Sequence, residues 1–406
     1  MKVLMFGWEF PPHASGGLGT ACYGLTKGLS HKGIEVLFVL PRASRNTNQD
    51  FVKIISAEDI KKIKFIEIDS PLTPYLTSAE YLERKNEAIE YGRSDEIKKI
   101  YGKNLFEEVY RYRQKAGFIA RHNNFDVIHC HDWMTYGAGI EAKKASGKPL
   151  VIHVHATEFD RTGGNVNQCV YDLEREGMHA ADLIMAVSNL TKQKIIEHYD
   201  IPEWKVTVVH NAVEFPEYNE GEMFHIKPYE KIVLFLGRIT IQKGPDYFIY
   251  AAKKVLEHDP NVKFIIAGSG DMEPFIINKV AELGLSDKIL FAGFLKGKDI
   301  DKAYKMADLY VMPSISEPFG ITPLEAMRNG TPVLISHQSG VSEVINHCLK
   351  VDFWDINDMA NKMLSVLKYQ ELHQTLKEHG EMEVKKFNWD IPAEKVITVY
   401  NKALCT

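Results

Sequence analysis

The sequence predicts an α/β fold made of two doubly wound parallel sheets. Short apolar runs with the length of buried strands alternate with helix-length segments along most of the 406 residues. The polar stretch 214–230 interrupts this alternation, and strand–helix units start again after it. We therefore predict an N-terminal domain at 1–214, a C-terminal domain at 215–387, and a helix at 388–406 that packs back toward the first domain.

The elements of the first half begin with an apolar run at 2–8, which lacks polar alternation and is typical of a strand covered on both faces by helices. A helix at 20–31 and a strand at 33–42 complete the first strand–helix–strand unit. The segment 181–199 combines a strand and a helix, with Ser188 as the expected helix cap. The other expected elements are strands within 64–70, 125–135, 148–161 and 205–214, and an amphipathic helix at 104–122.

The second half repeats this pattern. Its last strand–loop–helix unit, 309–329, contains a turn rich in Gly, Pro, Ser and Glu between an apolar strand and a helix at about 323–329. The preceding elements are expected as strands within 231–238, 262–270 and 288–295, and helices within 246–259, 271–284 and 299–307.

The composition is that of a soluble globular protein, with 45% hydrophobic and 25% charged residues. A net charge of −5 gives no bulk attraction to nucleic acid or anionic membranes. No run approaches 18 apolar residues, so we expect no membrane span. The five cysteines are scattered and contain no CxxC pair, which indicates reduced thiols and a cytoplasmic location.

In the first half, residues suited to binding a ligand follow the expected strands at three places. Gly16 and Gly17 lie in a loop that enters a helix, where a ligand can approach the backbone closely. Asp132 and His155 end two neighbouring strands. His153 and His155 share one strand face and could bind a metal, but no third ligand stands at a recognisable spacing, so we predict no metal site.

Three tyrosines, Tyr75, Tyr81 and Tyr91, occupy the irregular segment between 50 and 124. They either form a surface on which carbohydrate stacks or are ordinary surface and core aromatics, and the second interpretation is favoured.

The second half contains the residues suited to an anion. Arg238 and Lys243 stand five residues apart in a strand–helix loop, where a planar fork and a point charge can flank one phosphate group. The glycines of the segment 268–270 and the loop 316–320 also follow strands. All of them are therefore expected at one edge of the sheet, and a diphosphate is the ligand that they fit together.

Two carboxylates, Glu317 in the loop and Glu325 in the following helix, have three possible roles. They can complement the helix dipole, act as a glycosidase acid–nucleophile pair, or bind a donor, with Glu325 on ribose hydroxyls and Glu317 on a sugar. The third role fits their neighbours best. The Asp299–Asp301 pair opens a short helix and is interpreted as capping.

At the level of motifs, the chain resembles the retaining glycosyltransferases of the GT-B fold, in particular the glycogen/starch synthase-like and sucrose-phosphate-synthase-like families. The motifs are FGWEFPPHASGGLGT, HCHDW, HVHATEFDR, GRITIQKG, AGSGD and SEPFGITPLEAM, and they span nearly the whole chain. The resemblance implies two Rossmann-like domains facing an interdomain cleft.

The same resemblance implies roles for single residues. Arg238 and Lys243 would neutralise the departing nucleoside diphosphate, Glu317 would bind the donor sugar, His155 would lie beside that sugar, and Asp132 would lie near the acceptor. The implied donor-binding residues are Gly16, Gly17, Gly237, Gly268, Gly270, Phe319, Gly320, Ile321 and Glu325.

The activity implied is transfer of glucose from ADP- or UDP-glucose to an α-glucan, without a cofactor or metal. One departure weakens the glucan assignment: Ala14 stands where bacterial ADP-glucose-dependent synthases usually have lysine. Sucrose-phosphate or trehalose-type synthesis, another glycan acceptor, and a nucleotide-sugar epimerase of the same fold remain alternatives. A phosphorylase would need a pyridoxal-phosphate lysine motif, which is not found. A non-catalytic carbohydrate-binding protein would not need Arg238, Lys243 and Glu317 together.

Overall fold

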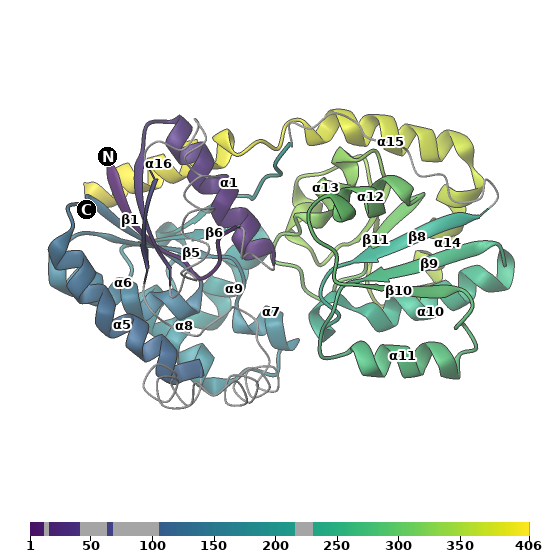
Figure 1. Ribbon diagram of the computed structural model, residues 1–406, viewed down its shortest axis with the longest axis horizontal. Coiled ribbons are helices and arrows are strands. Elements are labelled where there is room, and N and C mark those ends of the chain that lie inside the picture. Colours follow the sequence, from purple (N-terminus) through teal and green to yellow (C-terminus); the bar gives the residue numbers. More distant parts are fainter. Residues whose placement is uncertain (12–15, 41–62, 68–104, 216–229, 406) are drawn as a thin grey trace, which may run out of the picture. The chain divides into compact units, whose positions relative to one another are not determined.

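A computed structural model describes residues 1–11, 16–40, 63–67, 105–215 and 230–405. It divides the chain into two compact units, which consist of residues 1–157, 167–211 and 389–406, and of residues 158–166 and 212–388 (Figure 1). Residues 158–166 thus group with the second unit, whereas the sequence analysis placed them in the first domain. Tyr75, Tyr81, Tyr91 and Ala14 lie outside the described residues.

The first unit contains a seven-stranded sheet of order β3-β2-β1-β4-β5-β6-β7 in which all neighbours pair in parallel. Its strands are β1 (Lys2–Phe6), β2 (Glu35–Leu40), β3 (Ile63–Glu67), β4 (Val127–His131), β5 (Leu150–Val154), β6 (Leu183–Ala186) and β7 (Val206–Val208). Its helices are α1 (Gly17–His31), α5 (Leu105–His122), α6 (Trp133–Ser146), α8 (Gln168–Ala180), α9 (Asn189–Tyr199), η1 (Glu203–Lys205) and α16 (Asp390–Leu404).

The second unit contains a six-stranded parallel sheet of order β10-β9-β8-β11-β12-β13. Its strands are β8 (Lys231–Leu236), β9 (Val262–Ala267), β10 (Ile289–Gly293), β11 (Leu309–Met312), β12 (Val333–Ser336) and β13 (Leu349–Val351). Its helices are α7 (Glu158–Thr162), η2 (Ile241–Lys243), α10 (Pro245–His258), α11 (Glu273–Glu282), α12 (Lys298–Met306), α13 (Thr322–Arg328), η3 (Gly340–Glu343), α14 (Ile356–Lys368) and α15 (Gln370–Val384).

Both sheets have the same winding. Each starts in the middle, runs outward through two strands, and returns to the other side of its first strand. The predicted α/β fold with two doubly wound parallel sheets is therefore confirmed. Ligands of such sheets bind where the strand order reverses, outside the carboxyl ends of the strands. Here the reversals lie between β1 and β4 and between β8 and β11.

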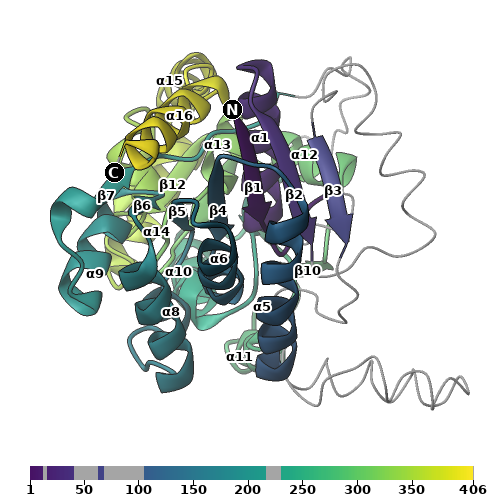
Figure 2. The same cartoon turned by 90° about the vertical axis from the view of Figure 1, so that its left-hand side faces the viewer.

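In the first unit, helices cover both faces of the sheet. The Cys130 sulfur on β4 faces α6, because a Cβ added at Gly139 would approach it to 2.4 Å. The neighbouring His129 faces the opposite side, where its Nδ1 lies 2.6 Å from the Tyr400 hydroxyl of α16. Figure 2 shows α1 and α16 on one side of the sheet and α5, α6 and α8 on the other. The helix α16 thus forms part of the first unit's core.

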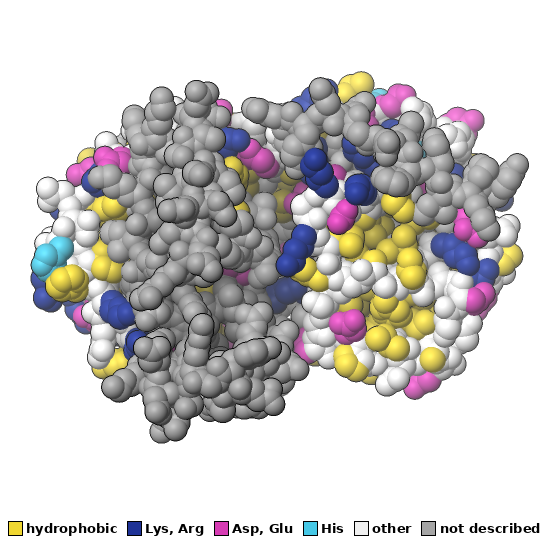
Figure 3. Space-filling model, in the orientation of Figure 1, with side chains coloured by type: hydrophobic (Ala, Val, Ile, Leu, Met, Phe, Trp, Pro, Cys, Tyr) yellow, Lys and Arg dark blue, Asp and Glu magenta, His cyan; other side chains and the backbone are white. Residues whose placement is uncertain are grey.

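In the second unit, alternate residues of β11 face different helices. Val311 joins the apolar core beneath α10, α11 and α14, whereas the Tyr310 hydroxyl donates to the Thr322 hydroxyl of α13 at 2.8 Å. Hydrophobic side chains gather on one face of this unit (Figure 3). Leu290 on the edge strand β10 is exposed. No helix among the described residues is long and apolar enough to cross a membrane.

Candidate active site

In the second unit, the predicted cation and the predicted carboxylate lie together at the switch point, the place between β8 and β11 where the strand order reverses. Lys243 ends η2 after β8, and Glu317 lies in the loop after β11, the strand beside β8. The Lys243 ammonium forms an ion pair with the Glu317 carboxylate. Both side chains are largely buried, with 17% and 9% of their areas exposed. The Ser314 hydroxyl lies 3.3 Å from the same Glu317 oxygen. Residues 74 positions apart in the chain therefore form one polar group at the sheet edge.

Gly244 holds the lysine loop against the end of β11. Its φ of +61° is a left-handed conformation, and a Cβ there would lie 2.3 Å from the Pro313 carbonyl oxygen. Any other residue would meet both the backbone strain and that clash. The helix α10 begins directly afterwards, with Pro245 in its first turn. Glycine at this position thus lets Lys243 reach Glu317.

Close approach also requires a glycine at position 268, after β9. Its φ is +143°, and an added Cβ would lie 1.8 Å from the Gly237 carbonyl oxygen. Gly237 in turn donates its N–H to the Ala267 carbonyl at 3.0 Å. The loops after β8 and β9 therefore pack backbone to backbone, with Gly270 and Ile239 also in contact. In this arrangement Arg238 donates to the Gln242 side chain at 3.2 Å.

The loop that carries Glu317 is fixed by backbone hydrogen bonds. The Glu317 N–H donates to the Gln338 carbonyl, and the Glu317 carbonyl accepts from Gly340, both at 2.9 Å. The Phe319 carbonyl accepts from Val341 at 2.7 Å. Phe319 and the nearby Ile321 are buried, and Gly320 between them has a φ of +99°. The segment 316–321 is thus a rigid part of the second unit.

Ser316 in this loop makes a further contact that the sequence did not reveal. Its hydroxyl donates to the Asp160 carboxylate of α7 at 2.6 Å, and both side chains are buried. This hydrogen bond joins two segments 156 positions apart. The HVHATEFDR motif contains Asp160, but its pairing with a serine could not be read from spacing.

Glu325 lies on α13, one element beyond this loop. Burial raises the pKa of its carboxyl, although the nearby Arg328 guanidinium and the Tyr304 hydroxyl oppose the shift. Tyr304, which is fully buried in α12, donates to Glu325 at 3.2 Å. Tyr304 was not predicted as a site residue, because a single tyrosine on a short charged helix gives no signal for this role.

The interpretation of Asp299 and Asp301 as helix caps was wrong. The helix α12 begins after Gly297, and no side chain caps it. The Asp301 carboxylate instead accepts from Arg328 of α13 and, at 2.9 Å, from the amide of Asn329, which directly follows α13. Asp301 therefore ties α12 to the helix that carries Glu325.

The first unit places Asp132 and His155 side by side at the ends of β4 and β5. The Asp132 carboxylate accepts from the His155 N–H at 2.7 Å and from the Ala156 N–H at 3.3 Å. Asp132 has a φ of +58° and ψ of 168°, a conformation that is very unfavourable for a residue with a side chain. Burial lowers the pKa of His155 to about 3, so its imidazole is neutral at physiological pH.

Gly16 and Gly17 lie at the start of α1, after β1 and across the first unit's switch point from Asp132. Among the described residues, no atom lies within 4 Å of a Cβ added at Gly17. One N–H of this helix start is already taken, since Gly19 donates to the buried Glu9 carboxylate at 3.0 Å. Glu9 was not predicted; its place within FGWEFPP gave no periodic signal.

The predicted residues therefore form two sets. The set in the second unit consists of Gly237, Arg238, Lys243, Gly268, Gly270, Glu317, Phe319, Gly320, Ile321 and Glu325; the set in the first unit consists of Gly16, Gly17, Asp132 and His155.

Two parallel sheets wound in this way, with these loops at the switch points, define the GT-B glycosyltransferase class. The chain belongs to the group 1 glycosyltransferases. The family described as "Glycosyl transferases group 1" matches residues 222–382, and "Glycosyltransferase Family 4" matches residues 15–215. An uncharacterised glycosyltransferase of Methanocaldococcus jannaschii is 31% identical over 100% of this chain and 99% of its own length.

Two better-described proteins are more distant. The mannosylfructose-phosphate synthase of Agrobacterium fabrum is 24% identical over 70% of each chain. Among solved structures, the sucrose-phosphate synthase of Thermosynechococcus elongatus superposes with a TM-score of 0.78 at 19% identity, over 100% of this chain and 99% of its own. This structural likeness supports the fold, and the family membership makes the chain a transferase.

Proposed function

We propose that the protein transfers a hexosyl unit, with retention at the anomeric carbon, from a nucleoside-diphosphate sugar, with glucose as the favoured sugar. The observation that carries this proposal is the buried ion pair of Lys243 and Glu317 at the second unit's switch point. Without ligand, the negative charge of Glu317 neutralises the positive charge of Lys243. A diphosphate would bring two or more negative charges to this lysine and to Arg238, and would release Glu317 to accept hydrogen bonds from sugar hydroxyls.

These cations suit the chemistry of the bond that breaks. Departure of the nucleoside diphosphate leaves negative charge on its oxygens and an oxocarbenium-like sugar. Preorganised donors on such developing charge are worth about 2.7–4 kcal/mol each. Because Arg238 and Lys243 supply positive charge, the proposed transfer needs no divalent metal. In the first unit, His155 and Asp132 are proposed to serve the sugar and the acceptor.

For the acceptor, we propose a small phosphorylated sugar or polyol rather than an α-glucan. The support is that the Agrobacterium relative and the Thermosynechococcus neighbour are both named as sugar-phosphate synthases. An α-glucan remains the second candidate, favoured by the HCHDW motif at 129–133. Both acceptors present hydroxyl nucleophiles, so the proposed donor chemistry is the same.

A donor–acceptor panel tests this proposal. The protein is incubated with ADP-, UDP- and GDP-sugars, each alone, with fructose 6-phosphate, glucose 6-phosphate or inositol phosphate, and with glycogen. Released nucleoside diphosphate is measured. We expect release from one donor that a phosphorylated acceptor stimulates. Stimulation by glycogen alone would establish the glucan synthase, release that no acceptor stimulates would indicate an epimerase, and no release would reject transfer.

The residue-level test is Lys243→Ala, which should reduce donor-dependent release at least 100-fold, since it removes a stabilising charge of about 2.7 kcal/mol or more. Lys253→Ala, an exposed lysine on α10, is the matched control and should keep full activity. Near-normal turnover of a folded Lys243→Ala protein would refute the assigned role.

A further inference from the structure

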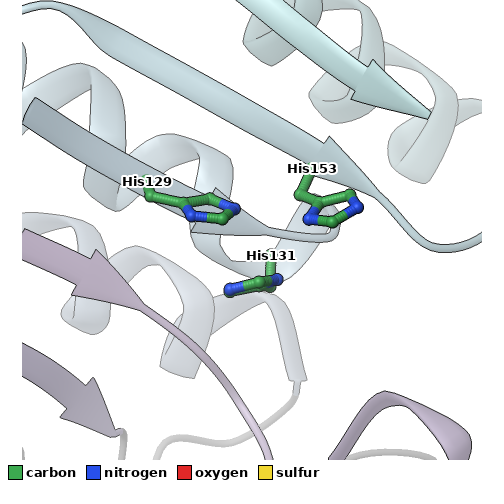
Figure 4. A group of neighbouring side chains, drawn as sticks. All are labelled: His129, His131 and His153. Atoms are coloured by element: carbon green, nitrogen blue, oxygen red, sulfur yellow. The ribbon is translucent and has the colours of Figure 1, made fainter. Parts of the chain in front are cut away.

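Three histidines with no proposed role in transfer form a buried cluster in the first unit. His129 and His131 come from β4, and His153 comes from β5, in register beside His131. All three are almost completely buried. One ring nitrogen of each lies within 4.8 Å of a ring nitrogen of both others. Figure 4 shows the three rings gathered between the two strands on the same side of the sheet.

Within the described part of the chain, several buried nitrogens of the cluster have no hydrogen-bond partner. These are Nε2 of His129, Nε2 of His131 and both ring nitrogens of His153. An unpaired buried polar atom destabilises a fold, and such atoms are rare in folded proteins. Four of them in one place are therefore unexpected for a purely structural core.

In two of the rings, Nδ1 already has a hydrogen-bond partner. A histidine that binds a metal through one ring nitrogen usually makes a hydrogen bond with the other. His129 Nδ1 lies 2.6 Å from the Tyr400 hydroxyl, and His131 Nδ1 lies 2.9 Å from Nε2 of His155. When each Nδ1 carries the proton and donates it outward, each Nε2 keeps a lone pair. The two unpartnered Nε2 atoms are then ready to act as ligands.

In the sequence, the pair His153 and His155 had no third ligand at a recognisable spacing, because His129 and His131 lie on a different strand. Parallel pairing of β4 with β5 supplies what the spacing could not show.

We propose that His129, His131 and His153 bind one divalent transition-metal ion, with zinc as the best-suited ion, and that this ion clamps β4 to β5 beneath α16. Imidazole nitrogens suit zinc, nickel and copper rather than magnesium or calcium. Zinc binds them at about 2.0–2.1 Å, which places two nitrogens on a tetrahedral ion about 3.3 Å apart. The rings therefore need to move inward by an ångström or so. The site is structural and separate from the proposed donor chemistry in the second unit.

Direct measurement on the unmodified protein tests the site. The protein is produced without a histidine tag in zinc-supplemented medium, dialysed against metal-free buffer, and its metal content is determined by mass spectrometry. We expect close to one zinc per chain. Protein unfolded with chelator and refolded with Co²⁺ should show the intense visible bands of a low-coordinate cobalt–imidazole site, and Zn²⁺ should displace them. Metal-free preparations that also fail to take up cobalt on refolding would overturn the proposal.

Variants identify the ligands without relying on transfer activity. His153→Leu should lose the bound zinc, whereas His258→Leu, at an exposed position on α10, should retain it. Tyr400→Phe keeps the ring but removes the hydroxyl beside His129, and should weaken zinc binding about 10–100-fold. If His153→Leu does not fold, the zinc affinity of Tyr400→Phe and the cobalt spectrum still test whether the cluster binds the metal. Unchanged stoichiometry and affinity in both cluster variants would place any bound zinc elsewhere and reject this site.

Discussion

Gly24 and Trp389 are in such close contact that no side chain fits between them: a Cβ on Gly24 would lie 2.1 Å from the indole ring. Gly24 belongs to α1, and Trp389 immediately precedes α16. The adjacent Gly28 meets the Trp389 carbonyl oxygen in the same way, at 2.5 Å. Two glycines on one face of α1 thus allow α16 to pack closely against the first unit.

This contact predicts that Gly24→Ala destabilises the first unit. Overpacking of this kind costs about 1–3 kcal/mol, although alanine favours helices. The control is Gly117→Ala in α5, where the nearest atom to the new Cβ is 3.7 Å away. That change should be neutral or stabilising by about 0.5–1 kcal/mol. Urea unfolding of both variants checks the difference, and equal stability would show that α16 does not sit as described.

Removal of the Glu317 charge should have opposite effects on product binding and on transfer. In the proposed function, the Glu317 carboxylate that pairs with Lys243 in the free protein competes with the diphosphate for this lysine. Glu317→Gln should therefore bind the free nucleoside diphosphate more tightly than the unmodified protein. Its kcat/KM for transfer should fall at least 10-fold, since the proposed contact with the sugar is weakened. Calorimetry and the release assay measure the two effects, and weaker nucleotide binding would argue against competition.

The assignment of Glu325 to ribose can be tested with altered nucleotides. The unmodified protein should prefer its nucleoside diphosphate to the 2′,3′-dideoxy analogue by about 10-fold or more, the value of a hydrogen bond to a charged group. Glu325→Ala should bind both equally, while the exposed Glu282→Ala keeps the preference. Tyr304→Phe, which removes the hydroxyl that holds Glu325, should give an intermediate result. A preference that survives in Glu325→Ala would exclude the ribose contact.

Glu383 predicts a stability change with pH. Although burial alone would raise it, the pKa of this carboxyl is lowered, because the N–H groups of Asn346 and His347 and the His347 ring bind the carboxylate. A lowered folded-state pKa means that the stabilisation is fully present above the unfolded value near 4.5 and is lost as pH falls through the lower folded value.

Glu383→Gln should therefore destabilise the second unit by about 2 kcal/mol at pH 7. The difference in stability between this variant and the unmodified protein should disappear below pH 4. Glu378→Gln on the exposed side of the same helix should behave like the unmodified protein. Thermal unfolding at several pH values provides the comparison, and a gap that persists at low pH would mean that the carboxylate charge is not involved.

The sequence predicted the strands well because parallel strands buried on both faces leave continuous apolar runs. Thus β11 ends within one residue of the predicted Leu309–Pro313, and Ser188 caps α9 as predicted, accepting from the Thr191 N–H. It also predicted that Lys243 and Glu317 meet at one sheet edge. Their ion pair follows from topology, since both loops leave the carboxyl ends of neighbouring strands.

Interactions set by side-chain direction between distant segments could not be predicted. Asp301 looked like a helix cap because local spacing cannot reveal Arg328, which lies on another helix. Glu9 and Asp160 likewise find their partners only after folding. The histidine cluster was missed for the same reason, because two strands from different parts of the chain contribute to it.

The position of α16 has a consequence for biosynthesis. The ribosome makes residues 212–388, which form most of the second unit, before it makes the helix that completes the first unit. A nascent chain that has emerged as far as residue 211 still lacks the tryptophan that fills the face of Gly24 and the tyrosine that reaches His129. The usual order, in which the N-terminal domain folds first, cannot run to completion here. The face of α1 that α16 covers therefore lacks its partner helix until synthesis has passed residue 404.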